Sequence, residues 1–192
     1  MGMDKLGRKS NAEKRKNQII WALYDCLSEK GHETITIKKI AERAHLPHGV
    51  IHYYFQGKEE ILTSLISSLR EVYLQLWNDT LEICSEEMLI DTGITFLAEK
   101  MVLDSKINRV LYNLVQMGFE KTKVRKALRQ IYQIYREQLA DLFFASLPPD
   151  VQNQKSVVLL AIVEGLALQW MIDPGFMKKN QIKKILYTAL EV

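Results

Sequence analysis

The segment 34–58 limits the possible folds of this chain more than any other part of the sequence. Its apolar residues recur at spacings of three and four, as in helices that bury one face: Ile37, Ile40 and Ala41, then Leu46, Val50, Ile51, Tyr54 and Phe55. The hydroxyl of Thr36 is placed to cap the first helix, and Pro47 suits the first turn of the second, at about residues 47–54. We therefore predict two short helices joined by a tight turn near Ala44 and His45.

The second of these helices has an outward face without a carboxylate. The residues outside its apolar stripe are small, flat or able to form hydrogen bonds: Pro47, His48, Gly49, His52 and Tyr53. A helix this short and this polar on one side is poorly suited to a protein core. Its size and chemistry favour an element that enters a DNA groove.

These residues resemble the helix-turn-helix of the TetR family of bacterial transcriptional regulators. The family pattern is matched by Thr36, Ile40, Ala41, Ala44, Gly49, Phe55, Lys58 and Leu62. Two positions differ, because His45 stands at a turn position that is usually Gly, and His52 stands where the family usually has Tyr. His tolerates a left-handed turn better than most residues that carry a Cβ, and at position 52 it keeps a ring and a donor.

The resemblance also implies which residues contact DNA. Base edges are expected to face Lys38, Pro47, His48, Gly49 and Val50, and phosphates are expected to be held by Thr36, His52, Tyr53 and Lys58. We expect His48 to contribute most to specificity, because it can donate and accept a hydrogen bond, whereas Val50 offers only methyl contact to a thymine. The cation of Lys58 would add to the positive end of the following helix.

The distribution of charge agrees with this interpretation. The 192 residues have a net charge of only +3, but residues 1–58 hold 11 Lys and Arg against 6 Asp and Glu, while residues 59–192 hold 15 against 17. All four histidines, His32, His45, His48 and His52, lie in the first segment, so lower pH should raise its positive charge. The basic excess therefore coincides with the helix-turn-helix.

Cysteine usage and hydropathy favour a cytoplasmic protein without a membrane partner. Cys26 and Cys84 lie in apolar helical contexts and form neither a disulfide framework nor metal-type spacing. The polar, basic N-terminus lacks the apolar region of a secretory signal. The longest apolar run, at 157–163, is too short to span a bilayer.

The predicted fold is all-α with about nine helices, and four segments are expected. Residues 1–9 form a basic tail, which either reaches DNA or serves only as a solvated end, and residues 10–57 form the three-helix DNA-binding domain. Its first helix begins at a Ser10 to Glu13 capping box and ends before Gly31. Residues 58–83 form a connecting helix, and residues 84–192 form a helical domain for effector binding and dimerisation.

The remaining chain divides into further helices without any hairpin signal. Expected helices lie at about 86–103, 106–120, 122–146, 152–172 and 178–190. Breaks are expected at Gly118, at Pro148, Pro149 and Asp150, and at Asp173, Pro174 and Gly175.

A dimer interface is predicted in the last two helices. The run 157–172 is apolar nearly all round, which requires burial on several sides. The resemblance implies an isologous four-helix bundle, with an interface at Leu159, Val163, Leu166, Ile182, Ile185 and Leu186. An ordinary core within one chain is the alternative.

Large aromatic or flexible side chains in the middle helices are candidates for an effector pocket, although most such residues serve only packing. The candidates are Tyr73, Trp77, Phe96, Met101, Tyr112, Met117, Phe119, Tyr135, Glu164 and Trp170. Glu164 interrupts an apolar run, so it would bind a cationic effector or form a polar contact at the dimer seam.

Three functions remain open. The first is a homodimeric repressor that binds a palindromic double-stranded operator and is released by an unknown small molecule. The second is a DNA-binding dimer without an effector. The third is a metal site or enzyme built on His48 and His52, which are spaced i, i+4 but lack a third ligand and the glutamate of zinc proteases. We favour the first function, with no enzymatic activity, metal or cofactor.

Overall fold

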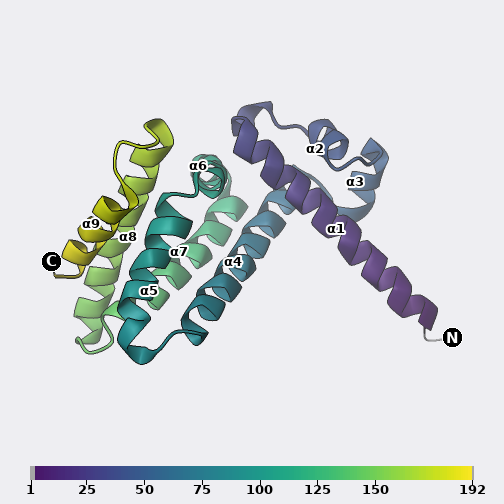
Figure 1. Ribbon diagram of the computed structural model, residues 1–192. Helices are drawn as coiled ribbons and strands as arrows, with labels where there is room; N and C mark the ends of the chain where they lie inside the picture. The colour runs from purple at the N-terminus through teal and green to yellow at the C-terminus, as the bar shows by residue number, and fades with distance from the viewer. Residues whose placement is uncertain (1–2, 192) are drawn as a thin grey trace. The chain divides into compact units, whose positions relative to one another are not determined.

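The structure is a computed structural model that describes residues 3–191 and the side chains of residues 11–191. Within that part of the chain there are nine α-helices and no strand, which confirms the all-α prediction (Figure 1). The helices are α1 (Met3–Glu29), α2 (Ile37–Arg43), α3 (His48–Tyr54), α4 (Lys58–Glu82), α5 (Leu89–Phe96), α6 (Ser105–Glu120), α7 (Thr122–Phe143), α8 (Pro149–Ile172) and α9 (Lys179–Glu191). Short 3-10 segments, η1 (His32–Thr34) and η2 (Glu86–Met88), and a π-helical segment, η3 (Leu97–Val102), complete the chain.

Several helix boundaries differ from the sequence predictions. Helix α7 ends at Phe143, and α8 begins at Pro149, so Pro149 and Asp150 lie inside a helix and not in the expected break. Helix α1 begins at Met3, so Ser10 lies inside it and is no N-cap, and the predicted tail is helical from residue 3. No proline interrupts this segment, and Lys, Arg and Leu favour the helix. Gly118 lies within α6 and does not break it. The single helix expected at 86–103 is divided into η2, α5 and η3.

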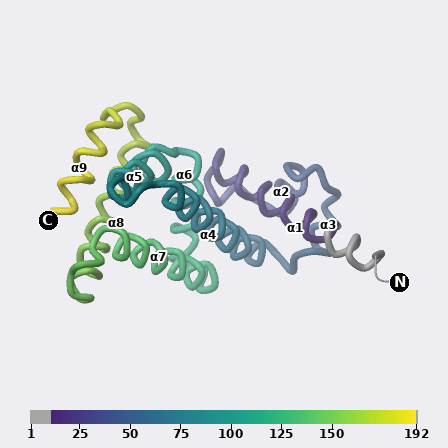
Figure 2. Tube along the Cα trace, turned by 60° about the horizontal axis from the view of Figure 1, so that its bottom comes forward, coloured from purple at the N-terminus to yellow at the C-terminus, as the bar shows by residue number. Residues whose placement is uncertain are grey.

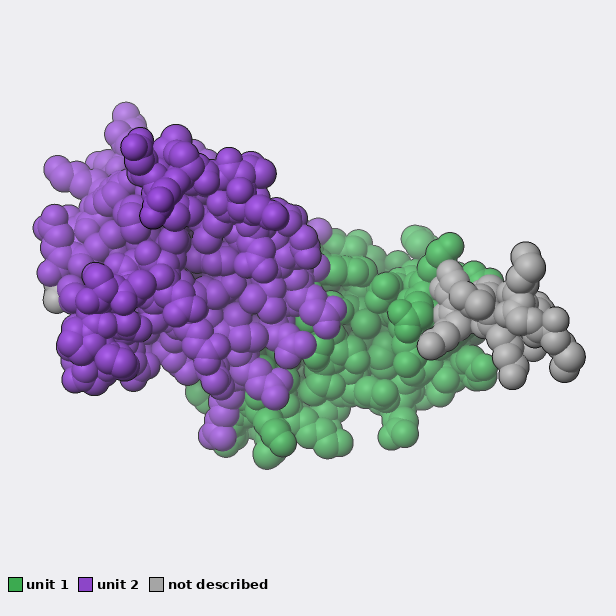
Figure 3. All heavy atoms as spheres, turned by 90° about the horizontal axis from the view of Figure 1, so that it is seen from below, with its two compact units in different colours: residues 1–69, 110–128 green, residues 70–109, 129–192 purple. Residues whose placement is uncertain are grey.

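The chain divides into two compact units, which Figure 3 colours separately. Unit 1 comprises residues 1–69 and 110–128, and unit 2 comprises residues 70–109 and 129–192. Helices α4, α6 and α7 each contribute residues to both units. By sequence, unit 1 holds 15 Lys and Arg against 9 Asp and Glu, whereas unit 2 holds 11 against 14. The positive charge of the protein is therefore concentrated in unit 1.

Unit 1 is built around the apolar face of α1, which packs against α2 and α3. Its core includes the fully buried side chains of Ile19, Leu23, Ile40, Ile51 and Leu62. These residues come from four helices, so the apolar stripes predicted for the short helices meet one common core. Burial of such side chains stabilises each helix by about 1.5–3 kcal/mol per residue, which is more than a seven-residue helix contributes by itself.

In unit 2, helix α8 packs against α9 and η3, and Figures 1 and 2 both show α8 and α9 side by side. Two polar clusters at the surface hold α9 against α5 and η3. Asp91 of α5 accepts hydrogen bonds from Lys183 Nζ at 2.8 Å and from the Tyr187 hydroxyl at 2.5 Å. Glu99 of η3 pairs with Lys179. Helix α9 is therefore held by an apolar face and by ion pairs at its edge.

Candidate DNA-binding interface

The turn between α2 and α3 is closed by a recurrent helix-ending motif. The backbone N–H of Leu46 donates to the carbonyl oxygen of Ala41 at 3.0 Å, and that of His45 donates to Glu42 at 3.1 Å. These are the two bonds of a Schellman motif, in which the residue after the helix adopts a left-handed conformation. His45 occupies that position with a φ of 52°. The prediction that His replaces Gly in a left-handed turn is thus confirmed.

Capping and a contact from α1 fix the ends of α2. The hydroxyl of Thr36 accepts a hydrogen bond from the backbone N–H of Lys39 at 3.2 Å, as expected for an N-cap. At the other end, Gln18 Nε2 donates to the carbonyl oxygen of Ala44 at 2.6 Å. The orientation of α2, and of the turn that follows, is therefore tied to α1.

Helix α3 presents the outward face that its sequence predicts. Ile51 and the following Phe55 are buried and anchor the helix, while Pro47, His48, Gly49, His52 and Tyr53 are exposed. Tyr53 is 82% exposed, which is unusual for a side chain of its size. The rings of His48 and His52 lie edge to face, with centroids 5.0 Å apart. Because α3 has no carboxylate, this face can approach phosphates without charge repulsion.

The other predicted contact residues differ in their surroundings. Thr36 and Lys38, at the start of α2, are exposed, and Val50 is partly buried. Lys58 is half-buried, and its Nζ donates to the carbonyl oxygens of Ile35 at 2.6 Å and His32 at 3.2 Å. Burial, and to a smaller extent the charge of Lys121, lowers the pKa of Lys58. In this conformation Lys58 joins η1 to the start of α4, so it positions the interface.

The His48 and His52 pair does not extend to a metal centre in the described part of the chain. No group of three or more His, Cys, Asp or Glu side chains is close enough there to hold a metal ion. Two imidazoles alone leave half of a tetrahedral zinc site without protein ligands.

Five of the predicted pocket residues come together in unit 2. The ring of Tyr73 lies 4.4 Å from that of Tyr135, 5.7 Å from that of Phe96 and 6.2 Å from that of Trp77, between centroids. The hydroxyl of Tyr73 contacts Met101 Sδ at 3.9 Å. Burial raises the pKa of both Tyr73 and Tyr135. These side chains form an aromatic cluster of Tyr73, Trp77, Phe96, Met101 and Tyr135.

Of the other five candidates, Glu164 lies close enough to the cluster for its charge to raise the pKa of Tyr135, and the other four are not among the ring contacts of the cluster. Tyr112, Met117 and Phe119 belong to unit 1, and Phe119 is 75% exposed. Trp170 contacts Phe176, with ring centroids 6.3 Å apart. Partial burial raises the pKa of Glu164, which a hydrogen bond with Tyr132 and the charge of Arg136 oppose.

The structure places most of the predicted dimer residues inside the single chain. Leu159, Val163, Leu166, Ile182 and Leu186 are buried in the single chain, and Ile185 is partly buried. They form the contact between α8 and the rest of unit 2, so they are not available to a partner. The exposed face of α8 consists instead of Val157, Val158, Ala161, Glu164, Leu168 and Ile172.

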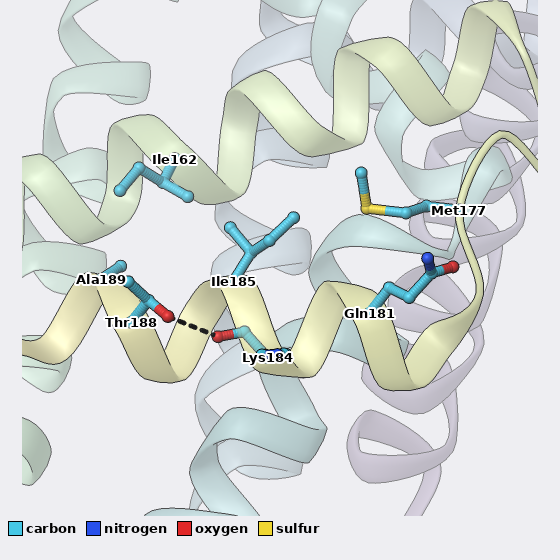
Figure 4. Close-up of a pocket in the computed structure, with 7 residues that line it drawn as sticks. All are labelled: Ile162, Met177, Gln181, Lys184, Ile185, Thr188 and Ala189. Atoms are coloured by element: carbon cyan, nitrogen blue, oxygen red, sulfur yellow. Dashed lines mark hydrogen bonds between the residues drawn. The ribbon is translucent and has the colours of Figure 1, made fainter.

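A groove lies between α8 and α9 beside that exposed face. It has a volume of about 550 Å³, and Figure 4 shows Ile162 of α8 and Ile185 of α9 pointing into it from opposite sides. Met177, Gln181, Lys184, Thr188 and Ala189 complete its lining. Helix α8 is also long and apolar enough to span a membrane, but core helices of soluble proteins can have the same length and composition.

Two polar groups that position helices of unit 1 were missed by sequence reasoning. Gln18 and Asn113 bind backbone carbonyls far away in the sequence, at Ala44 and Leu27. A polar residue in an otherwise apolar helical stripe is the signal that could have identified Asn113, because a buried amide needs partners.

Comparisons with known proteins agree with this geometry. Residues 19–65 match the family model described as bacterial regulatory proteins, tetR family. The HTH-type transcriptional regulator PksA of Bacillus subtilis (strain 168) is 23% identical, over 93% of this chain and 89% of PksA.

Two solved structures share the fold. A transcriptional regulator from Pseudomonas aeruginosa PAO1 has a TM-score of 0.81 and 16% identity, over 93% of this chain and 89% of that one. NalD is described as the secondary repressor of the MexAB-OprM multidrug efflux pump in Pseudomonas aeruginosa. It has a TM-score of 0.68 and 21% identity, over 94% of this chain and 96% of NalD. Residues 19–65 therefore carry the DNA-binding domain of the TetR family of transcriptional regulators, and the chain as a whole shares the fold of solved transcriptional regulators.

Proposed function

We propose that this protein is a homodimeric repressor that binds a palindromic DNA operator and is released from it by a small-molecule effector. The observation that carries the proposal is the exposed face of α3, with two adjacent imidazoles and Tyr53 but no acidic side chain. NalD, a structural neighbour, is described as a repressor, which supports the same direction of regulation here.

The residues that contact DNA fall into two groups, those that face base edges and those that bind phosphates. His48 and Val50, with Pro47, Gly49 and Lys38, face the base edges in the major groove, and His48 provides the directional hydrogen bond. Thr36, His52 and Tyr53 bind phosphates on either side. Lys58 helps to hold η1 and α4 in place beneath these contacts.

Dimerisation uses the outer face of α8 together with α9. Four large aliphatic side chains, Val157, Val158, Leu168 and Ile172, are exposed along this one helix, which is unfavourable unless another surface covers them. Ala161 and Gly165 lie among them, and a Cβ added at Gly165 would meet open space. A symmetry-related α8 can approach closely at these small residues, and the neighbouring groove can receive its larger side chains.

The effector binds at the aromatic cluster in unit 2. A largely apolar site with a few polar groups suits a small organic ligand, and the cluster provides the hydroxyls of Tyr73 and Tyr135 among apolar rings. Phe96 directly precedes the π-helical segment η3, and such segments are frequent at functional sites. An effector that binds better to a conformer unable to bind DNA increases the population of that conformer. The helices that contribute residues to both units would transmit this change.

The proposal is tested by fluorescence anisotropy with an operator duplex selected from a random-sequence library. The protein should bind as two subunits per palindrome with nanomolar affinity, and the affinity should fall steeply with salt. Absence of salt-dependent binding, or one subunit per palindrome, would contradict it.

A DNA-binding dimer without an effector is the second candidate, and the close packing of the aromatic cluster favours it. Ring centroids only 4.4–6.2 Å apart are typical of a filled core. A ligand screen by thermal shift separates the two functions. A true effector should stabilise the protein by about 2.7 kcal/mol at one hundred times its Kd and reduce operator binding, whereas a closed core would respond to no compound.

A further inference from the structure

A second basic surface lies in unit 1, outside the helix-turn-helix. It is the turn between α6 and α7 with the first turn of α7, and it contains Lys121, Lys123, Arg125 and Lys126 without an acidic residue between them. We call these four residues the basic turn. Lys123, Arg125 and Lys126 are exposed, and the side chain of Lys123 is 78% exposed.

The shape of the basic turn is fixed by contacts within unit 1. Arg125 Nε donates to the carbonyl oxygen of Gly118 at 2.8 Å, and its Nη2 donates to that of Phe119 at 2.6 Å. A Cβ at Gly118 would lie 2.8 Å from Leu128 Cδ1, so glycine permits the close approach of the two helices. Arg125 therefore stabilises the turn, while Lys123 and Lys126 extend from a rigid base.

The basic turn lies beside the start of α4, the helix that follows α3 in the chain. Lys123 Nζ is 3.6 Å from the carboxylate of Glu59, in the first turn of α4. Lys121 is close enough to Lys58 for the two cations to repel each other. Only three residues separate the end of α3, at Tyr54, from Lys58. The basic turn therefore lies next to the start of α4, four residues along the chain from the end of α3.

We propose that the basic turn binds the DNA phosphate backbone beside the half-site, outside the groove that α3 reads. This inference extends the proposed operator binding and depends on it. Polyanionic DNA fits a cluster of lysines held on a rigid turn, because each phosphate contact releases a condensed counterion. The contact adds affinity on any sequence and carries no base specificity.

The test compares two exposed double variants with equal loss of charge. Lys123→Gln with Lys126→Gln changes the basic turn, and Lys100→Gln with Lys178→Gln changes unit 2. Each is titrated with the selected operator duplex, trimmed to the footprint of the protein or extended by about 10 base pairs, one helical turn, on each side. Thermal melts confirm that both variants fold like the wild type.

On the extended duplex, the basic-turn variant should bind more weakly. Its slope of log affinity against log salt should be smaller by about 3.6, because a dimer loses four phosphate contacts at about 0.9 each. The loss of affinity of the basic-turn variant relative to the wild type should be smaller on the trimmed duplex. The unit 2 variant should keep the wild-type slope. Conversely, Glu59→Gln removes the competing carboxylate and should strengthen binding to the extended duplex.

Equal slopes for the basic-turn variant and the wild type, with intact operator binding by both, would overturn this inference alone. Loss of salt-dependent binding by the wild type itself would overturn the proposed function as well. Anionic lipid vesicles provide a further control. If the basic-turn variant loses vesicle binding but keeps DNA binding unchanged, the surface serves a membrane and the DNA assignment is refuted.

Discussion

Asn113 of α6 caps the end of α1: its Nδ2 donates to the carbonyl oxygen of Leu27 at 3.0 Å. The same carboxamide accepts a hydrogen bond from the backbone N–H of His32 through Oδ1 at 2.9 Å. Leu27 and Asn113 are 86 residues apart in the sequence, and both are buried. One amide therefore holds this part of α6 against α1 and η1 in unit 1.

Replacing Asn113 with Ala should lower the free energy of unfolding by about 1–3 kcal/mol, because buried backbone groups at Leu27 and His32 lose their partner. Urea denaturation followed by circular dichroism measures the difference. Gln133→Ala, which removes an exposed side-chain hydrogen bond to Glu137, is the control and should change stability by less than about 0.5 kcal/mol. Equal losses for the two variants would show that the Asn113 cap contributes no more than a surface contact.

His45→Gly should stabilise the fold by about 0.5 kcal/mol. A residue with a Cβ in the left-handed region costs roughly 1–2 kcal/mol, and the greater freedom of Gly in the unfolded chain offsets about 0.5–1 kcal/mol of the gain. Gly175→Ala is the reciprocal change, because Gly175 has a φ of 97°, and it should destabilise the protein. Thermal unfolding measures both, and a lower Tm for His45→Gly would refute the strain at the turn.

His48→Ala should relax specificity at one base pair of each half-site. The loss of a directional hydrogen bond should cost about 1–3 kcal/mol on the preferred operator and little on operators that differ at that pair. Tyr53→Phe removes a predicted phosphate contact and should weaken all operators equally. Competition binding with single-base operator variants distinguishes the two patterns, and a uniform loss for His48→Ala would assign this residue to the backbone.

Leu168→Glu should convert the dimer to a monomer. It places a charge on the exposed face of α8, where a partner subunit would leave it without solvent. Ile83→Glu is the matched control, because Ile83 is 89% exposed and lies outside that face. Sedimentation velocity should give one species at half the wild-type mass for Leu168→Glu, with weaker operator binding. A dimer that survives this substitution would move the interface elsewhere.

The Asp91 cluster should make stability depend on pH in acid. Hydrogen bonds from Lys183 and Tyr187 lower the pKa of Asp91 below its usual value. A carboxyl group with a lowered pKa in the folded state stabilises the fold above its unfolded pKa, about 3.9, and this contribution disappears as pH falls further. The Tm difference between wild type and Asp91→Asn should therefore be present at pH 7 and shrink as pH falls below about 3.9 through the lowered folded-state pKa of Asp91. A difference that is independent of pH would exclude the charge as its cause.

Several features could be read directly from the sequence. The helix-turn-helix, the Thr36 cap, the left-handed turn at His45 and the outward face of α3 each depend on interactions within a few residues. Backbone hydrogen bonds and side-chain periodicity act at that range, so the local pattern was sufficient to predict them. The roles of the exposed residues in DNA binding stay predictions.

Other features required the tertiary structure. Which side of the apolar helix α8 is covered by its own subunit depends on α9 and η3, and this placed Leu159 and Val163 inside while Val157 and Leu168 stayed exposed. The inward course of Lys58 and the cap formed by Asn113 depend on carbonyl oxygens 23 and 86 residues away. The sequence by itself determined which helices form and which of their faces are apolar, because these depend on neighbours within one or two turns. Only the tertiary structure decided which faces and polar groups meet, because burial and long-range hydrogen bonds depend on segments distant along the chain.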